Sequence, residues 1–210
     1  MRSLVVIAGL LLTTVACAEQ IPAGAVRNLP HLAAAYRAQW PDAPLKHIPA
    51  GQIEQESGWN EKAHLHTSRE DGYGLGQMTV TKTFNIFTDA VKYKALKNWN
   101  WKADPYNPLY QLTFLVLQDK DNFLQTKAIN AEERWKISLV KYNAGEGRIN
   151  VRRRYAIAAG LPTDRWTGGL ELAHGPSEVS ILYGRPLWKA VNEYPKIIFQ
   201  RGQKYKGAIQ

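Results

Sequence analysis

The stretch that decides how this sequence is interpreted is QESGWN, residues 55–60. The residues before it predict a helix over residues 49–57. Gly58 ends that helix, because glycine readily adopts the left-handed conformation common at helix C-termini. Glu56 would then lie in the last turn, at the edge of any cavity that the fold forms. Apolar neighbours on both sides favour its burial, which raises the pKa of a carboxyl group. We expect Glu54, two residues away, to be solvated.

Two further motifs follow in the chain: DGYGLGQM at residues 71–78 and KYNAGEG at residues 141–147. The three glycines of the first motif predict a turn that brings the backbone close to a ligand. In the second motif, Tyr142 and Asn143 precede Gly145, which ends a predicted helix. Together the motifs indicate one carboxylic acid beside a backbone turn and a Tyr/Asn pair. Such an arrangement suits the cleavage of a sugar chain.

In their order and spacing, these motifs resemble the catalytic domain of the soluble lytic transglycosylases, relatives of goose-type lysozyme. The resemblance covers about residues 45–160. It implies a mostly α, lysozyme-like single globular domain with a glycan-binding groove. It also implies that Glu56 is the only catalytic acid/base and that Tyr142 lies close to it as a second catalytic residue. The substrate-binding residues that it implies are Ser57, Gly74, Leu75, Gln77 and Asn143.

The chain departs from the family pattern at three places. Glu61 stands where the family usually has proline after the residue matching Asn60. Gly76 precedes Gln77 where methionine is common. The loop over residues 63–74 is longer than usual and contains two histidines and two acids. These departures bear on contacts between this loop and the substrate, not on Glu56.

Cleavage by a single carboxyl requires Glu56 to act first as an acid and then as a base. The substrate's N-acetyl oxygen would stabilise the positive charge at C1, and the sugar's 6-hydroxyl would then close onto C1. The product would be a 1,6-anhydromuramyl end. One alternative is a hydrolytic muramidase with Asp71 or Glu70 as second carboxylate. A third interpretation, an inactive glycan-binding or assembly module, does not explain a semi-buried acid.

The histidines and glycines of the central loop do not predict a cofactor. His64 and His66 are two residues apart without a third ligand at metal-site spacing, so we interpret them as polar surface. The glycine pattern lacks the Lys-Ser/Thr that completes a phosphate-binding loop. We therefore expect neither a metal nor a cofactor.

The charge of the chain indicates an acidic polymer as partner. The formal net charge is +9 and becomes +8 if residues 1–18 are removed, because they contain Arg2 and no acid. We expect peptidoglycan glycan strands as the partner and a monomeric protein. We interpret Arg152–Arg154 as a solvated helix face rather than a nucleic-acid site, because no nucleic-acid-binding motif accompanies them.

The first eighteen residues have the form of a signal peptide: an early arginine, an apolar run over residues 4–15 and a small-residue cleavage site at residues 16–18. The run is too short to span a bilayer, so we expect no stable membrane span. Export, with the periplasm as destination, is the preferred interpretation. An outer-membrane lipoprotein attached through Cys17 is the alternative.

The expected layout is a signal peptide (1–18), an N-terminal leader and helix (19–45), a lytic transglycosylase-like core (46–160), and a C-terminal extension packing on the core with a basic tail (161–210). The first helix should open at Pro30. Residues 60–80 should form loop and turn without a β-hairpin. Asn107 and Asn130 should cap two helices. Residues 196–210 should fray.

Overall fold

The computed structural model describes residues 20–182 and 184–209, which are mostly helical. The predicted signal peptide (1–18), with Cys17, lies outside these ranges. The helices are α1 (Ala23–Gln39), α2 (Ile48–Ser57), α3 (Ile86–Ala90), α4 (Pro108–Leu124), α5 (Ala131–Ala144), α6 (Glu146–Ala158) and α7 (Leu187–Gly202), with the short helical turns η1 (Lys94–Leu96), η2 (Trp166–Leu170), η3 (Pro176–Glu178) and η4 (Gln203–Tyr205). The strands are β1 (His64–His66), β2 (Glu70–Tyr73), β3 (Met78–Thr81), β4 (Ile181–Leu182) and β5 (Arg185–Pro186). In the described part of the chain, none of the helices combines the length and apolar character needed to cross a membrane.

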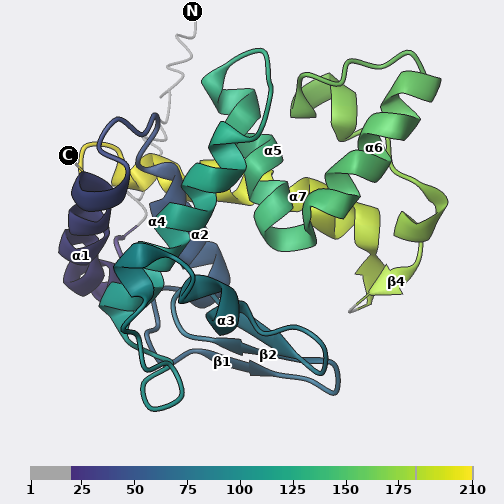
Figure 1. Ribbon diagram of the computed structural model, residues 1–210. Coiled ribbons are helices and arrows are strands. Elements are labelled where there is room, and N and C mark those ends of the chain that lie inside the picture. The colour runs from purple at the N-terminus through teal and green to yellow at the C-terminus, as the bar shows by residue number, and fades with distance from the viewer. Residues whose placement is uncertain (1–19, 183, 210) are drawn as a thin grey trace, which may run out of the picture.

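The helices pack around one main core. α1 packs on α4, α4 on α5, and α7 on both α2 and α5. Each of these five helices contributes a fully buried aliphatic side chain: Leu32, Ile53, Leu112, Leu139 and Ile198. Figure 1 shows the small sheet at the lower end of the molecule and α6 at the right, with α7 running behind α5. The predicted mostly α fold class is confirmed.

A three-stranded antiparallel sheet occupies much of the segment predicted as loop and turn. The order is β1-β2-β3, with His66 opposite Asp71 and Glu70 opposite Thr81. The expectation of no β-hairpin is therefore wrong. β1 is only three residues long and all three are exposed, so it is too short for the alternation over about four to eight residues that marks a half-buried strand in sequence.

Both predicted asparagine caps are confirmed. The side chains of Asn107 and Asn130 accept backbone N–H groups at 3.2 Å and 2.9 Å, at the starts of α4 and α5. The Glu133 side chain, in the first turn of α5, accepts the backbone N–H groups of Trp166 and Thr167 at 2.7 Å and 2.9 Å. The carboxylate therefore joins the start of α5 to the chain at η2.

The first helix begins earlier than predicted. It starts at Ala23, so Pro30 lies inside α1, and residues 23–28 are helical rather than a loose leader. Ala25 and Leu32, on either side of the proline, are both fully buried in the main core. This packing offsets the hydrogen bond that an internal proline removes, because tertiary burial contributes more to helix stability than local propensity does.

The prediction that the C-terminal residues fray is wrong for residues 196–209. α7 extends to Gly202, and Tyr205 is fully buried, where its hydroxyl accepts the Trp59 indole N–H at 2.9 Å. α7 approaches α2 closely at Gly51, where an added Cβ would lie 2.5 Å from the Ile198 carbonyl oxygen. The absence of a side chain at this glycine therefore permits the two helices to touch backbone to backbone.

Glu54, predicted to be solvated, is instead buried against the C-terminal segment. Its carboxylate accepts the Tyr205 hydroxyl and the Lys204 ammonium, the latter at 2.8 Å. The Arg201 guanidinium lies 3.6 Å from it. The physical reason for the correction is that these partners come from about 150 residues later in the chain.

Arg152, predicted to lie on a solvated face, is fully buried. Its guanidinium forms an ion pair with the equally buried Glu178 at 2.6 Å and donates to the Leu170 carbonyl at 3.0 Å and the Asn192 side chain at 2.7 Å. Arg154 does remain exposed. A buried charge must be paired and hydrogen-bonded, so Arg152 holds α6, η2, η3 and α7 together.

Candidate active site

Three hollows, of about 520, 400 and 340 Å³, lie next to one another, and we refer to them together as the groove. Glu70 of β2 and Asn143 of α5 line all three, so the hollows are neighbours. Glu56 lines the first and the third. The groove therefore runs past the C-terminal ends of α2 and α5, with β2 and β3 on one side and α7 on the other.

Glu56 lies in the last turn of α2, as predicted. Gly58 ends the helix in the left-handed conformation, with φ of 60°. Glu56 is half-buried, and burial of its carboxyl raises its pKa to about 7, against a smaller lowering by the hydrogen bond from Tyr194. Both protonation states are therefore populated at neutral pH. The group can donate a proton and then accept one without leaving its working range.

Tyr194 of α7 is the contact of Glu56 that sequence reasoning missed. Its hydroxyl donates to the Glu56 carboxyl, and its side chain is almost fully buried. Burial and the nearby Glu56 charge raise the pKa of Tyr194, so it acts as a neutral donor. No local motif marks this tyrosine, because it follows Glu56 by 138 residues. A pairing of this kind is visible only once α7 packs on α2.

Tyr142 lies near Glu56 but directs its proton elsewhere. The two residues line the same hollow, and burial together with the Glu56 charge raises the pKa of Tyr142. The Tyr142 hydroxyl donates to the Gly76 carbonyl at 2.7 Å. The contact joins the end of α5 to the turn over residues 74–77. Tyr142 thus positions that turn while remaining within electrostatic reach of Glu56.

The side chains of Ser57 and Leu75 are engaged within the protein. The Ser57 hydroxyl lies 3.1 Å from the Ile53 carbonyl and 3.0 Å from the Leu75 carbonyl. The Leu75 side chain is buried in the main core rather than facing the groove. Ser57 therefore links the end of α2 to the glycine turn, and the Leu75 side chain does not face the groove.

Gln111 of α4 holds the glycine turn in place, and sequence reasoning missed this residue. Its side-chain amide donates to the carbonyls of Tyr73 and Pro105 at 3.2 Å and 2.7 Å. Gly74 has φ of 66°, and a Cβ there would lie 2.4 Å from the Gln111 amide. Both the backbone conformation and the close approach therefore require glycine at this position.

Gln77 and Asn143, two of the predicted binding residues, lie beside the same hollows. Both line the second and third hollows. Gln77 is itself left-handed, with φ of 46°, and its side-chain amide donates to the Gly74 carbonyl at 3.0 Å. Its amide oxygen lies over Gly72, where an added Cβ would be 2.6 Å away.

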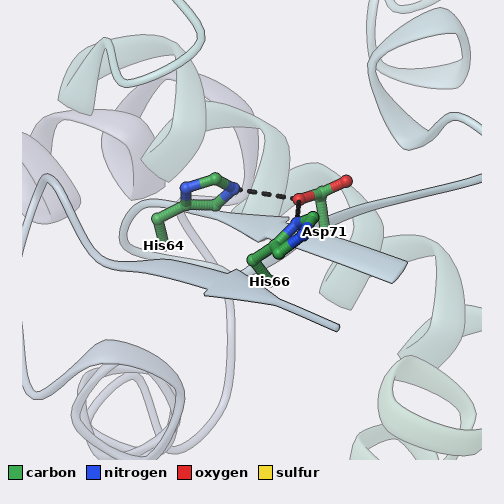
Figure 2. A group of neighbouring side chains, drawn as sticks. All are labelled: His64, His66 and Asp71. Atoms are coloured by element: carbon green, nitrogen blue, oxygen red, sulfur yellow. Dashed lines mark hydrogen bonds and ion pairs between the residues drawn. The ribbon is translucent and has the colours of Figure 1, made fainter. Parts of the chain in front are cut away.

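The two acids of β2 have different surroundings. Glu70 lines all three hollows, two of them shared with Glu56. Asp71 borders only the third hollow, and one of its oxygens is bonded by the imidazoles of His66 and His64 (Figure 2). The His66 hydrogen bond is the main contact that lowers the pKa of Asp71. Of the two predicted candidates for a second carboxylate, Glu70 is the better placed.

No protein-family model matches the chain, and no curated protein is significantly similar to it. The residues and their arrangement therefore carry the functional argument. The arrangement joins a carboxyl whose pKa is raised to about 7, the buried Tyr194 and the half-buried Tyr142 beside it, and a glycine turn held by Tyr142 and Gln111, all around neighbouring hollows.

Proposed function

We propose that this protein is a peptidoglycan lytic transglycosylase with a lysozyme-like fold. It would cleave the β-1,4 bond between N-acetylmuramic acid and N-acetylglucosamine and leave a 1,6-anhydromuramyl end. The observation that carries the proposal is Glu56, whose pKa is raised to about 7 by burial at the junction of two hollows. A carboxyl tuned in this way is what a one-acid mechanism needs.

In the proposed reaction, protonated Glu56 gives its proton to the glycosidic oxygen as the bond to C1 breaks. The substrate's own N-acetyl oxygen bonds to C1 and stabilises the developing positive charge. The 6-hydroxyl of the same sugar then attacks C1 and displaces the N-acetyl oxygen, while ionised Glu56 takes the hydroxyl proton. Glu56 ends protonated, ready for the next turnover, and no water is consumed.

The neighbouring residues have distinct proposed roles. Tyr194 holds the Glu56 carboxyl in position through its hydrogen bond. Tyr142 acts at the reacting centre and keeps the Gly76 carbonyl in place. Gln77 and Asn143 contact the glycan along the groove. The remaining predicted binding groups, Ser57 and the Gly74–Gly76 backbone, contribute as the rigid edge of the turn.

The proposal also covers location and partner. Export to the periplasm would bring a basic protein, with a net charge of +9 over the whole sequence, to a polymer that carries free carboxylates. A lipoprotein attached through Cys17 is the alternative form. The protein would act as a monomer, without a cofactor or nucleic acid.

Digestion of purified sacculi, followed by mass spectrometry of the released muropeptides, tests the proposed function. Anhydromuramyl ends are expected from the wild-type protein and not from Glu56→Gln. Reducing muramic ends would overturn the transglycosylase in favour of a hydrolase. Sacculi left unaltered by a folded wild-type protein would instead indicate a binding or assembly module.

The position of Glu70 supports a second candidate, a hydrolytic muramidase. Glu70 lines two of the hollows that contain Glu56, as a second carboxylate must. If substrate assistance replaces it, Glu70→Gln and Asp71→Asn, singly or together, should keep a substantial fraction of activity and the same product. A folded Glu70→Gln that is as inactive as Glu56→Gln, with reducing ends released by the wild type, would establish the muramidase.

A further inference from the structure

The β1–β2 hairpin gathers two imidazoles and a carboxylate at one point (Figure 2). His64 Nε2 lies 3.1 Å from Asp71 Oδ1, and His66 Nδ1 lies 2.7 Å from the same oxygen. One ligating atom from each residue lies within 4.8 Å of the other two. The sequence placed the two histidines in a loop without a third ligand, and the cross-strand pairing supplies that ligand.

Strand geometry explains the convergence. His64 and His66 are two residues apart on β1, so their side chains leave the same face of the strand. Asp71 is the direct cross-strand partner of His66, and side chains of opposed residues lie on one face. The His64 ring is also fixed by stacking on Tyr73, with 4.8 Å between ring centroids. Glu70, next to Asp71, points to the opposite face, toward the groove.

We propose that His64, His66 and Asp71 bind one divalent first-row metal ion, for which Zn²⁺ is the best match. Two imidazoles and a carboxylate are the ligands that Zn²⁺ accepts, with bonds of about 2.0–2.2 Å. Tetrahedral bonds of that length separate neighbouring ligand atoms by roughly 3.3–3.5 Å. The His64 contact to Asp71 would therefore open by roughly 0.2–0.4 Å and the His66 contact by roughly 0.6–0.8 Å. The two histidine nitrogens, which lie within 4.8 Å of each other, would settle at the same ligand separation through rotation of their exposed side chains.

The site is open to the ion and to water. The side chains of His64 and His66 are 42% and 75% exposed, so solvent can reach the ion and complete its coordination. Binding would replace the two imidazole–Asp71 hydrogen bonds. Each ring would then carry its proton on the other nitrogen, Nδ1 in His64 and Nε2 in His66, and that proton would face solvent.

An ion at this position would tie β1 to β2. Leu65 and Gly72, on the opposite face of the same hairpin, line the groove together with Glu70. The ion would therefore stabilise one wall of the groove without contacting Glu56. The metal site stands independently of the proposed catalytic function, because it needs only the hairpin.

Isothermal titration of the untagged protein with Zn²⁺ tests this inference. The wild type should bind one ion per chain, and His64→Ala, His66→Ala and Asp71→Ala should each weaken binding by about tenfold or more. His31→Ala removes an imidazole from α1 and serves as the matched control, with unchanged binding. Circular dichroism should show that the exposed substitutions leave the fold intact.

Two spectroscopic measurements distinguish a three-ligand site from surface binding. Co²⁺ should give the visible absorption of a low-coordinate ion in the wild type and lose it in each of the three variants. Zn²⁺ should slow amide hydrogen exchange over residues 64–73. No saturable Zn²⁺ binding by the wild type would overturn the site. Zn²⁺ binding that is lost in both His64→Ala and His66→Ala but unchanged in Asp71→Ala would also overturn the site, because the two histidines alone would then hold the ion.

Discussion

Replacing Glu56 by glutamine separates the burial of this side chain from its ability to ionise. Glutamine has the same shape and can still accept the Tyr194 hydroxyl through its amide oxygen. It cannot donate or take up a proton in the reaction, so turnover should fall by about two to four orders of magnitude. It also lacks the carboxylate that burial disfavours, so the variant should become more stable than the wild type at high pH.

The size of the stability effect follows from the pKa of Glu56. In the folded protein it is raised from 4.5 to about 7, so the folded state holds this proton more tightly than the unfolded state does. The free energy of unfolding must therefore fall as pH rises from 4.5 through 7. At 1.36 kcal/mol per pKa unit, the wild type loses roughly 3 kcal/mol of stability over this range, and Glu56→Gln does not.

Urea unfolding followed by tryptophan fluorescence, at pH 4 and pH 8, measures the effect. The stability difference between variant and wild type should shift in favour of the variant by roughly 3 kcal/mol between the two pH values, or about 6–12 °C in Tm. A difference that does not change with pH would show that the pKa of Glu56 is not raised. A folded variant with activity within a few-fold of wild type would remove Glu56 from the mechanism.

Three further substitutions test the groups around the site. Tyr194→Phe removes the hydrogen bond that lowers the pKa of Glu56, so the alkaline limb of the pH–kcat profile should move upward; a downward shift would contradict this role. Tyr142→Phe should reduce kcat more than it raises KM for glycan, and an equal loss of glycan affinity would make it a binding residue. Arg152→Ala leaves the buried Glu178 carboxylate with only the longer, 3.9 Å contact to Arg148 and should cost about 3–5 kcal/mol in urea unfolding. The exposed control Arg154→Ala should stay within about 0.5 kcal/mol of wild type, and equal effects would refute the buried ion pair.

The helix ends that the sequence predicts correctly all depend on short-range chemistry. Asn107 and Asn130 bind backbone N–H groups within one turn, and Gly58 needs only its own left-handed φ. These interactions are formed by neighbours in the chain, so they can be recognised without tertiary structure. The prediction that the first helix opens at Pro30 is wrong because it rests only on the local preference of proline. The buried side of α1 stabilises the helix on both sides of Pro30.

The β1–β2 hairpin is not predicted from the sequence because its own residues carry no clear strand signal. β1 is short and exposed, and what defines it is its antiparallel pairing with β2. Without that pairing, Asp71 has no assigned position relative to His64 and His66. The candidate metal site could therefore not be predicted from the spacing of the two histidines.

QESGWN and its two companion motifs single out Glu56 as the candidate acid, and this assignment needs nothing beyond the sequence. The tertiary structure decided its surroundings: Tyr194 arrives from 138 residues away, and the pKa near 7 follows from burial. In the same way, Glu54 and Arg152 became buried through partners supplied by distant segments. A local pattern specifies a residue and its helix, but desolvation and charge pairing depend on every segment that packs around it.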